Sequence, residues 1–279
     1  MKYYSTRDAA VRMDAAEAIK MGLSRDGGLL TPCEIPQIDR AFLESLVNVR
    51  YQERAAKVMG LYLTDYTYEE LSGFAENAYG PEKFDCDAVA PVRTVDETTH
   101  CLELWHGPTS AFKDMALQCL PRFFSASAAQ LREQGKLDHD FLILVATSGD
   151  TGGAVANGFL GVEGIDVVVL YPKGRVSDIQ EKQFTTLGRN VTALEIEGTF
   201  DDCQRLVKSA FADTELKRRM RLTSANSINV ARFLPQTFYF FHAYAQLRAQ
   251  GVTSPIVVSV PSGNFGNLTA GLFARRMGL

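Results

Sequence analysis

Residues 141–161 read FLILVATSGDTGGAVANGFLG, and this stretch decides the fold. It opens with an apolar run, continues through a polar, glycine-rich segment, and closes on a sequence that favours a helix. A short apolar run that ends at turn residues is typical of a buried strand. The stretch therefore predicts a strand over 141–146 and a helix over 152–161.

The same alternation of apolar runs and helix-like segments continues on both sides of this stretch. Apolar, β-branched runs joined by helices are typical of a parallel sheet that helices cover on both faces. The sequence therefore predicts an α/β fold. The other predicted strands cover 101–105, 166–172, 191–197 and 255–260, and the other predicted helices cover 114–124, 199–213, 267–278 and a segment that ends at Leu187.

The N-terminal third of the chain is expected to be mainly helical. Residues 11–22 favour a helix, and Thr67 has capping-box spacing to Glu70 at the start of another. Residues 81–99, rich in Asp, Pro and Thr, form the candidate linker. The predicted organisation is an N-terminal helical region over 1–96 and an α/β region over 97–279, with a mobile small lobe over roughly 141–200.

Composition and charge exclude several classes of function. The chain has 279 residues, a formal net charge of −4 and a pI near 5.7, so no overall positive field draws it to nucleic acid or anionic lipid. No apolar run is long enough to cross a bilayer. The five cysteines include no C-x-x-C pair, and no histidine pair has metal-ligand spacing. These features predict a cytoplasmic protein without a nucleic-acid, membrane or metal partner.

Two polar, glycine-rich segments follow predicted strands, and both are candidate anion sites. Each precedes a helix, so that backbone N–H groups and the helix dipole face a ligand. Either loop alone is equally consistent with a plain connection. Neither contains the G-x-x-x-x-G-K-[ST] or G-x-G-x-x-G pattern, which disfavours a nucleotide. The first loop comprises Thr147, Ser148, Gly149, Asp150 and Thr151, and the second comprises Ser262, Gly263, Asn264, Phe265, Gly266 and Asn267.

A lysine with an unusual setting lies in the stretch HGPTSAFKDMALQ, residues 106–118. A lone lysine is most often a solvated charge, but Lys113 follows a Gly-Pro turn and the apolar Phe112 and precedes a predicted helix. This setting predicts a partly desolvated amine with a lowered pKa, able to attack an aldehyde. An amine nucleophile, a phosphate cradle and a carboxylate cradle together predict pyridoxal 5′-phosphate (PLP) as cofactor and an amino acid as substrate.

The stretch HGPTSAFKDMALQ resembles the PLP-lysine motif of threonine synthases of the bacterial and fungal type. The resemblance continues in YYSTRD, EAIKMGLSRDGGLLTP, ATSGDTGGA, YPKGRVSDIQEKQ, NSINVARFLPQ and PSGNFGN, in the same order along the chain. It implies PLP fold type II, the fold of the tryptophan synthase β family. In that fold a helical N-terminal region precedes two α/β lobes, and the cofactor lies between the lobes.

The resemblance also assigns roles to individual residues. It implies that Lys113 bonds covalently to PLP and then moves protons on the substrate. The loop over 262–267 would hold the cofactor phosphate, and the loop over 147–151 would hold the substrate carboxylate, with Asp150 near the phenolic oxygen of the cofactor. The candidates for the substrate phosphate are Lys173, Asn226, Ser227 and Asn229, with Arg175, Ser177 and Arg232 as further possibilities.

The reaction that the resemblance implies is the PLP-dependent conversion of O-phospho-L-homoserine and water to L-threonine and phosphate, in threonine biosynthesis. It proceeds by γ-elimination and then β-addition of water. The alternatives are a phospho-lyase that releases 2-oxobutanoate and an inactive ligand-binding remnant. The second alternative arises because family members continue well past the loop over 261–267. We therefore expect a truncated chain with an incomplete large lobe, acting as a monomer or homodimer.

Overall fold

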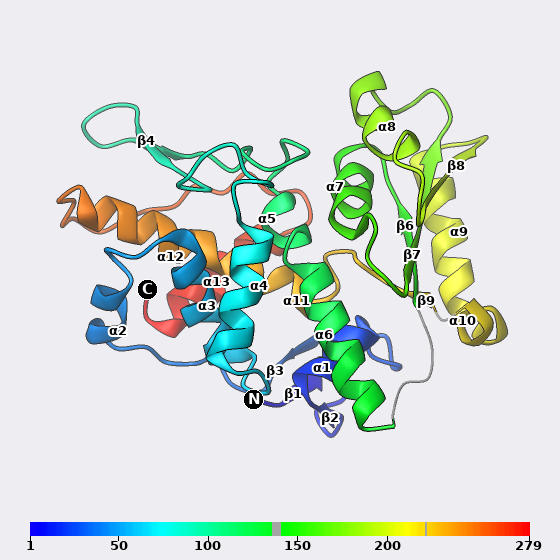
Figure 1. Ribbon diagram of the computed structural model, residues 1–279, viewed down its shortest axis with the longest axis horizontal. Helices are drawn as coiled ribbons and strands as arrows, with labels where there is room; N and C mark the ends of the chain where they lie inside the picture. Colours follow the sequence, from blue (N-terminus) through cyan, green and yellow to red (C-terminus); the bar gives the residue numbers. More distant parts are fainter. Residues whose placement is uncertain (136–140, 221) are drawn as a thin grey trace.

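The computed structural model describes residues 1–135, 141–220 and 222–279. Its elements form two groups that lie side by side (Figure 1). One group is a parallel sheet with helices on both faces, and the other consists mainly of helices. The resemblance implies two α/β lobes, and among the described residues one of the two groups contains a four-stranded parallel sheet while the other is mainly helical.

The parallel sheet contains four strands in the order β8-β7-β6-β9. Its centre is apolar, since Ile143, Val145, Val167 and Val169 are completely buried, as is usual for a sheet covered on both faces. The predicted strands over 141–146, 166–172 and 191–197 are confirmed to within one residue at each end. The strands are β6 (Phe141–Ala146), β7 (Ile165–Pro172), β8 (Val191–Ile196) and β9 (Leu222–Thr223).

Helices cover both faces of this sheet. In Figure 1, α7 and α9 lie on opposite sides of it. Successive residues of a strand point to opposite faces of a sheet, so the strands present side chains to the helices on both sides. Leu170 packs with Cys203 and Val207 of α9. The boundary of the small lobe near residue 200 stays a prediction, although α9 begins there and packs on the sheet. The helices are α7 (Asp150–Phe159), α8 (Asp178–Thr185), α9 (Phe200–Ala212) and α10 (Thr214–Met220).

The N-terminal region contains a small antiparallel sheet that the sequence analysis missed. Its order is β2-β1-β3. The helix predicted over 11–22 forms only as α1, because Arg12 and Met13 belong to β2. α1 packs against α6. The expectation of a mainly helical region was wrong in this respect, because strands of two or three residues are too short to show a periodic pattern. The elements are β1 (Tyr3–Ser5), β2 (Arg12–Met13), α1 (Ala15–Met21), β3 (Leu30–Pro32) and α6 (Leu120–Glu133).

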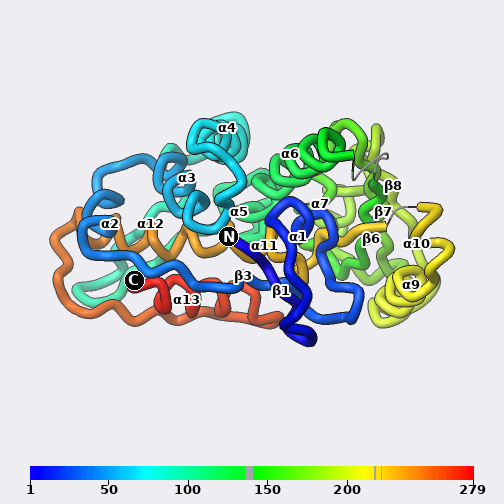
Figure 2. Tube along the Cα trace, turned by 90° about the horizontal axis from the view of Figure 1, so that it is seen from below, coloured from blue at the N-terminus to red at the C-terminus, as the bar shows by residue number. Residues whose placement is uncertain are grey.

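The helical group is built around α12, which packs against α3 and α13. Thr67 and Glu70 form the predicted capping box at the start of α4. Figure 2 shows α13 beside the segment that follows β3, where Ile38 N donates to Met277 O at 2.8 Å. The elements are α2 (Arg40–Ser45), α3 (Tyr51–Tyr62), α4 (Tyr68–Ala78), α12 (Pro235–Ala249) and α13 (Gly266–Met277).

The predicted strand over 101–105 forms only in part and does not join the parallel sheet. It appears as β5, which pairs antiparallel with β4 to make a separate hairpin. Its partner, Val92–Thr94, lies inside the candidate linker over 81–99, so this segment contains a short strand. A three-residue antiparallel pair leaves little sequence signal. The strands are β4 (Val92–Thr94) and β5 (His100–Leu102).

The predicted strand over 255–260 is absent from the described structure. These residues have no strand pairing, and Val257 and Val258 are 94% and 57% exposed. The residues have the β-branched composition of a strand, but a strand requires a neighbour to accept and donate its ladder hydrogen bonds. Among the described residues, no such neighbour lies beside this segment.

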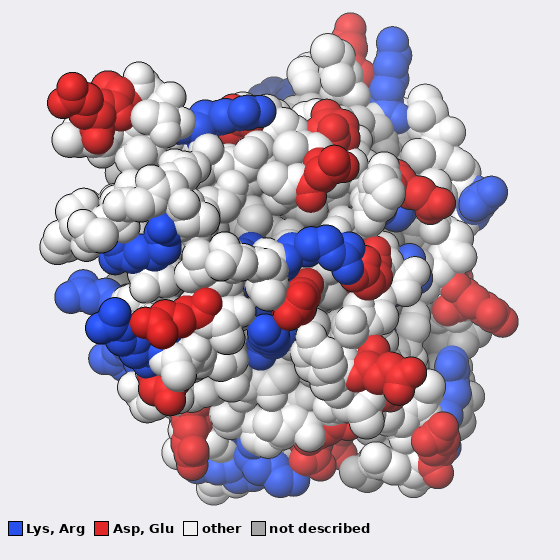
Figure 3. All heavy atoms as spheres, turned by 60° about the vertical axis from the view of Figure 1, so that its left-hand side comes forward, with Lys and Arg blue, Asp and Glu red and all other residues white. Residues whose placement is uncertain are grey.

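Charged side chains of both signs lie on the face of the molecule that Figure 3 shows. Acidic and basic side chains intermix on the face shown in Figure 3, and neither sign forms a large field there. Among the described residues, no helix combines the length and the hydrophobicity that a membrane span requires.

Candidate active site

The turn that precedes Lys113 is fixed by a buried carboxylate. Asp114 is completely buried, and its side chain accepts hydrogen bonds from Thr109 N at 2.8 Å and Thr109 Oγ1 at 2.7 Å. A Cβ at Gly107 would lie 2.6 Å from Asp114 Cβ, so only glycine fits there. Ser110 has a φ of 54°, which lies in a backbone region that residues other than glycine rarely adopt. The turn thus sets the direction of Lys113.

Lys113 reaches from this turn to the start of α7. It immediately precedes α5 (Asp114–Leu117), and its Nζ donates to Asp150 Oδ1 and to Thr151 Oγ1, both at 2.7 Å. Its side chain is 17% exposed, whereas that of Asp150 is 42% exposed. The amine is therefore shielded, while its carboxylate partner faces an opening to solvent.

The surroundings of Lys113 lower the pKa of its amine. The main cause is burial, which disfavours the ammonium form, and the positive charge of Arg232 acts in the same direction. Asp150 opposes both effects through its hydrogen bond and its negative charge. A lysine in this setting becomes neutral, and therefore nucleophilic, at a lower pH than a surface lysine does.

The loop over 147–151 is held in shape by its own first residue. Thr147 is 1% exposed, and its Oγ1 accepts from Gly149 N at 3.0 Å and from Gly152 N at 2.8 Å. Gly149 has a φ of 153°, and a Cβ there would collide with the side-chain oxygen of Gln180. The Thr147 hydroxyl is thus occupied inside the loop. Ser148 is exposed, and the N–H groups of Asp150 and Thr151, in the first turn of α7, lack intrahelical acceptors.

The loop over 262–267 has a more open structure. Phe265 precedes α13 with a φ of 53° and is 61% exposed. The side chain of Asn267 is bonded to Ser262 Oγ, and its Nδ2 donates to Pro261 O at 3.0 Å. A Cβ at Gly266 would lie 3.7 Å from Ser227 Cβ. The loop therefore lies beside the 226–229 segment, and no hydrogen bond links it to Lys113 among the described residues.

The 226–229 segment is a turn that leads into a short helix. Asn229 caps α11 (Val230–Phe233) by accepting from Ala231 N at 3.0 Å, and its Nδ2 donates to Ile19 O at 3.0 Å and to Ser224 O at 3.2 Å. Both N–H groups of this amide are bonded within the protein, and Asn229 is completely buried. Asn226 is half-buried and Ser227 is exposed. Substrate binding by these three residues stays a prediction.

Lys173 follows β7 and is already paired. Its Nζ lies 2.6 Å from Glu197 Oε1, and the two side chains are 54% and 83% exposed. Surface pairs of this kind contribute little free energy. Its role in substrate binding stays a prediction.

Two buried charged residues near the site were not among the principal sequence predictions. Asp114 fixes the turn, and Arg232, which is 5% exposed, donates from one terminal nitrogen to Ala225 O at 3.0 Å. The only sequence signal for Arg232 is a single cation within the apolar run 228–234, INVARFL. Such a residue is buried only when the fold provides a partner.

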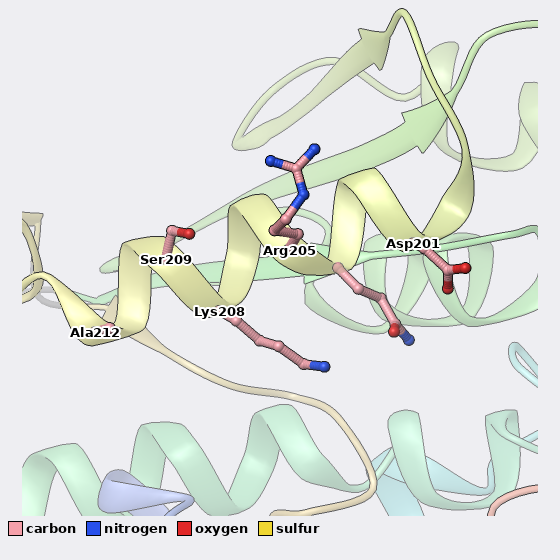
Figure 4. Close-up of a pocket in the computed structure, with 6 residues that line it drawn as sticks. Asp201, Arg205, Lys208, Ser209 and Ala212 are labelled. Carbon is pink, nitrogen blue, oxygen red and sulfur yellow. The ribbon is translucent and has the colours of Figure 1, made fainter.

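A surface hollow on α9 does not belong to this site. It has a volume of about 580 Å³ and lies along a single helix, α9. In Figure 4, Arg205 and Lys208 project from opposite sides of the helix. These charged groups do not converge on a common point, so we assign no ligand to it. The lining residues are Asp201, Gln204, Arg205, Lys208, Ser209 and Ala212.

Known proteins resemble this chain in both sequence and structure. The family described as "Threonine synthase N terminus" matches residues 2–79. Threonine synthase from Haemophilus influenzae is 44% identical over 280 residues, which cover 100% of this chain and 62% of that protein. PLP-bound threonine synthase from Brucella melitensis superimposes with a TM-score of 0.90 at 42% identity, covering 100% of this chain and 58% of that one.

This chain is homologous to threonine synthases. Threonine synthase from Escherichia coli agrees, with a TM-score of 0.85 at 41% identity over 100% of this chain and 62% of that one. The chain therefore spans less than two thirds of the length of the threonine synthases that it matches. It has their fold, so the prediction of PLP fold type II is confirmed.

Proposed function

We propose that this chain carries the PLP-binding part of a threonine synthase, with Lys113 as the residue that bonds to the aldehyde carbon of PLP. One observation carries the proposal: a shielded lysine amine lies 2.7 Å from both Asp150 and Thr151. The homology supports it, since a relative with a TM-score of 0.90 is described as PLP-bound.

The residues around Lys113 fit such a cofactor. The amine is shielded from water and has a lowered pKa, as a nucleophile toward an aldehyde requires. The loop over 262–267 presents N–H groups at the start of α13, where the helix dipole favours a phosphate. A Cβ at Gly263 would meet no atom within 4 Å, so a ligand has room to approach the backbone there. We propose that Ser262, Gly263, Asn264, Phe265, Gly266 and Asn267 hold the phosphate of PLP.

The substrate in this proposal is O-phospho-L-homoserine, and the products are L-threonine and phosphate. When bound, PLP stabilises the negative charge that develops on substrate carbons. Lys113 takes the proton from the substrate Cα and later returns a proton at Cγ. Asp150 and Thr151 hold the amine in position between these transfers. The N–H groups of Ser148, Asp150 and Thr151 bind the substrate carboxylate, and Asn226, Ser227 and Lys173 are the outer candidates for its phosphate.

The expected location and oligomeric state of the protein follow from the same proposal. A threonine biosynthetic enzyme acts on a small molecule, and we infer a cytoplasmic location, which the free thiols of all five cysteines support. We expect a monomer or a homodimer.

Absorbance titration tests the proposal. PLP added to the chain should give a stable visible absorption band, as expected for PLP bonded to a lysine. The band should be lost in Lys113→Ala and retained in Lys208→Ala, which removes an exposed lysine of α9. Circular dichroism checks that both variants are folded. An unchanged band in Lys113→Ala would contradict the proposal.

The reaction itself is tested with O-phospho-L-homoserine. Formation of L-threonine and phosphate in equal amounts supports a threonine synthase. Release of 2-oxobutanoate instead would show the lyase alternative. Absence of both products, together with a normal PLP band, would restrict the function of this chain to cofactor binding.

A further inference from the structure

We propose that His106 is a positioning residue of this site: its imidazolium form, held between Asp85 and Glu103, fixes the start of the turn that carries Lys113. The inference deepens the proposed function, on which it rests for the identity of the cofactor. It makes attachment of PLP at Lys113 depend on a proton that the lysine itself does not carry.

The ring of His106 lies between two acidic side chains, and we call these three residues the histidine clamp. Its Nδ1 lies 2.7 Å from Asp85 Oδ1, and its Nε2 lies 2.9 Å from Glu103 Oε2. An ionised carboxylate only accepts hydrogen bonds, whereas a neutral imidazole has one N–H donor and one nitrogen that only accepts. Both contacts are therefore hydrogen bonds only when both ring nitrogens carry a proton.

The surroundings of the ring favour this charged form. The side chains of His106 and Glu103 are only 16% and 17% exposed, whereas that of Asp85 is 78% exposed. Arg93 of β4 lies 3.6 Å from the same Glu103 oxygen and stabilises its negative charge. The hydrogen bond to Glu103 is the main cause that raises the pKa of His106; burial opposes it, and Asp85 adds to the rise. Within the described ranges, no other acidic group lies within ion-pair distance of the ring.

The histidine clamp connects the turn before Lys113 to two other segments of the chain. Asp85 follows α4, and Glu103 follows β5. The backbone is joined as well, since His106 O accepts from Asp85 N at 3.1 Å. The far end of the turn is fixed by the buried carboxylate of Asp114. The turn is thus anchored at its start by His106 and at its end by Asp114.

The turn needs both anchors because it contains a strained residue. Ser110 has a φ of 54°, a conformation that costs free energy and persists only where the surrounding structure holds it. Loss of an anchor lets the turn relax, and relaxation moves Lys113 away from Asp150 and Thr151, which its amine contacts at 2.7 Å. The protonated form of His106 therefore favours the conformation in which the amine is in place for PLP.

The direction of the pH dependence follows from the raised pKa of His106. The folded protein holds this proton more tightly than the unfolded chain does, so the stabilisation is complete below the ordinary pKa of histidine and is lost as the pH rises through the raised pKa. After that loss, one ring nitrogen faces a carboxylate oxygen with no hydrogen between them. We expect the turn to be anchored at weakly acidic pH and released at alkaline pH.

Trp105 gives a direct readout of the proton on His106. It is the only tryptophan in the sequence, and its ring is stacked on that of His106, with 5.8 Å between the centroids. A protonated imidazole quenches indole fluorescence more strongly than a neutral one does. The fluorescence of the chain should therefore increase as the pH is raised from about 5 to about 9, with a midpoint above the ordinary pKa of histidine.

Variants of the histidine clamp assign this fluorescence transition. His106→Gln should abolish it. Glu103→Gln and Asp85→Asn should move its midpoint to lower pH, with the larger shift for Glu103→Gln, because Glu103 is the main cause of the raised pKa. His100→Gln alters a nearby histidine of β5 whose Nδ1 contacts Thr94 Oγ1 at 3.2 Å. It is the matched control and should keep the wild-type transition.

The affinity for PLP, measured from the absorption band of lysine-bound PLP, tests the link to Lys113. At about pH 6.5, His106→Gln should bind PLP about fivefold more weakly than the wild type, because a charge-assisted hydrogen bond of the turn is lost. The difference should narrow as the pH rises through the midpoint of the fluorescence transition. A purely structural effect of the substitution would be the same at every pH. Glu103→Gln, which leaves the ring in place, should show a smaller difference with the same trend.

Either of two results would overturn the proposal: a wild-type chain without the fluorescence transition, or clamp variants, folded by circular dichroism, whose affinity for PLP differs from that of the wild type by the same factor at every pH. A normal PLP band without the fluorescence transition would overturn the positioning role alone. A normal transition without any PLP band would overturn the proposed function, and the positioning role with it. The two failures are therefore distinguishable.

Discussion

The two glycine-rich loops of this chain have similar sequences but different structures. The loop over 147–151 is closed around the buried Thr147 hydroxyl, whereas the loop over 262–267 exposes Phe265 to 61%. The loops differ in what precedes them. β6 is fixed between β7 and β9, but residues 255–260 pair with no strand among the described residues. A loop of this kind therefore takes its shape from the strand that leads into it.

The same difference separates the functions that the two loops can perform in this structure. The closed loop already presents Asp150 and Thr151 to Lys113, each at 2.7 Å. The open loop has its Asn267 side chain bonded within the loop itself. The first loop is ready to position a reacting group, while the second presents backbone to an incoming ligand.

The largest expected effect follows from removing the hydroxyl that closes the first loop. Thr147→Val keeps the shape of the side chain but leaves the N–H groups of Gly149 and Gly152 without an acceptor. We expect a loss of about 3 kcal/mol in the free energy of unfolding, measured with denaturant. Ser262→Ala in the open loop should lose about 1 kcal/mol or less. Equal losses would remove the distinction between the loops.

A smaller contrast is expected between the glycines of the two loops. Gly149→Ala places a side chain at a φ of 153° and against Gln180, so we expect a loss of about 2 kcal/mol. Gly263→Ala meets no atom within 4 Å and should change stability by about 0.5 kcal/mol or less. Thermal or chemical unfolding measures both. A tolerated alanine at position 149 would show that the first loop is not rigid.

The contact between the closed loop and Lys113 is tested by the pH dependence of the amine. Burial lowers the pKa of Lys113, and Asp150 opposes that shift. Asp150→Asn removes the opposing charge, so the pKa falls further and the neutral amine appears at lower pH. Competitive acetylation followed by peptide mass spectrometry gives the reactivity of Lys113 at each pH. Glu197→Gln, which alters the partner of Lys173, is the control. A curve that moves to higher pH in Asp150→Asn would contradict the assigned contact.

The smallest effect is expected at Lys173, outside both loops. Its pair with Glu197 is exposed to solvent, so Lys173→Ala should change the free energy of unfolding by about 0.5 kcal/mol or less. Affinity for inorganic phosphate, measured by calorimetric titration, decides its proposed role in binding. An affinity equal to that of the wild type would remove Lys173 from the candidate site.

Features that depend on neighbouring residues could be predicted from the sequence. Thr67 and Glu70, which form a capping box, lie three positions apart. The apolar composition of residues 141–146 predicts that this strand is buried. Lys113 could be singled out because the turn before it and the helix after it are both local. These predictions needed no knowledge of distant parts of the chain.

Features that depend on distant partners could not be predicted in this way. Asn229 donates to Ile19 O, 210 positions away in the sequence, so its structural role is not visible in the motif that contains it. The segment 255–260 has the composition of a strand but lacks a paired neighbour in the described structure. The burial of Arg232 likewise becomes apparent only when its surroundings are known.

The central claim is that the Lys113 amine bonds to PLP, and the most direct measurement is chemical trapping. The chain is mixed with PLP, reduced with borohydride, digested, and mapped by peptide mass spectrometry. The account predicts that the phosphopyridoxyl group lies on the peptide that contains Lys113. Modification mainly on another lysine, with the Lys113 peptide unmodified, would contradict it.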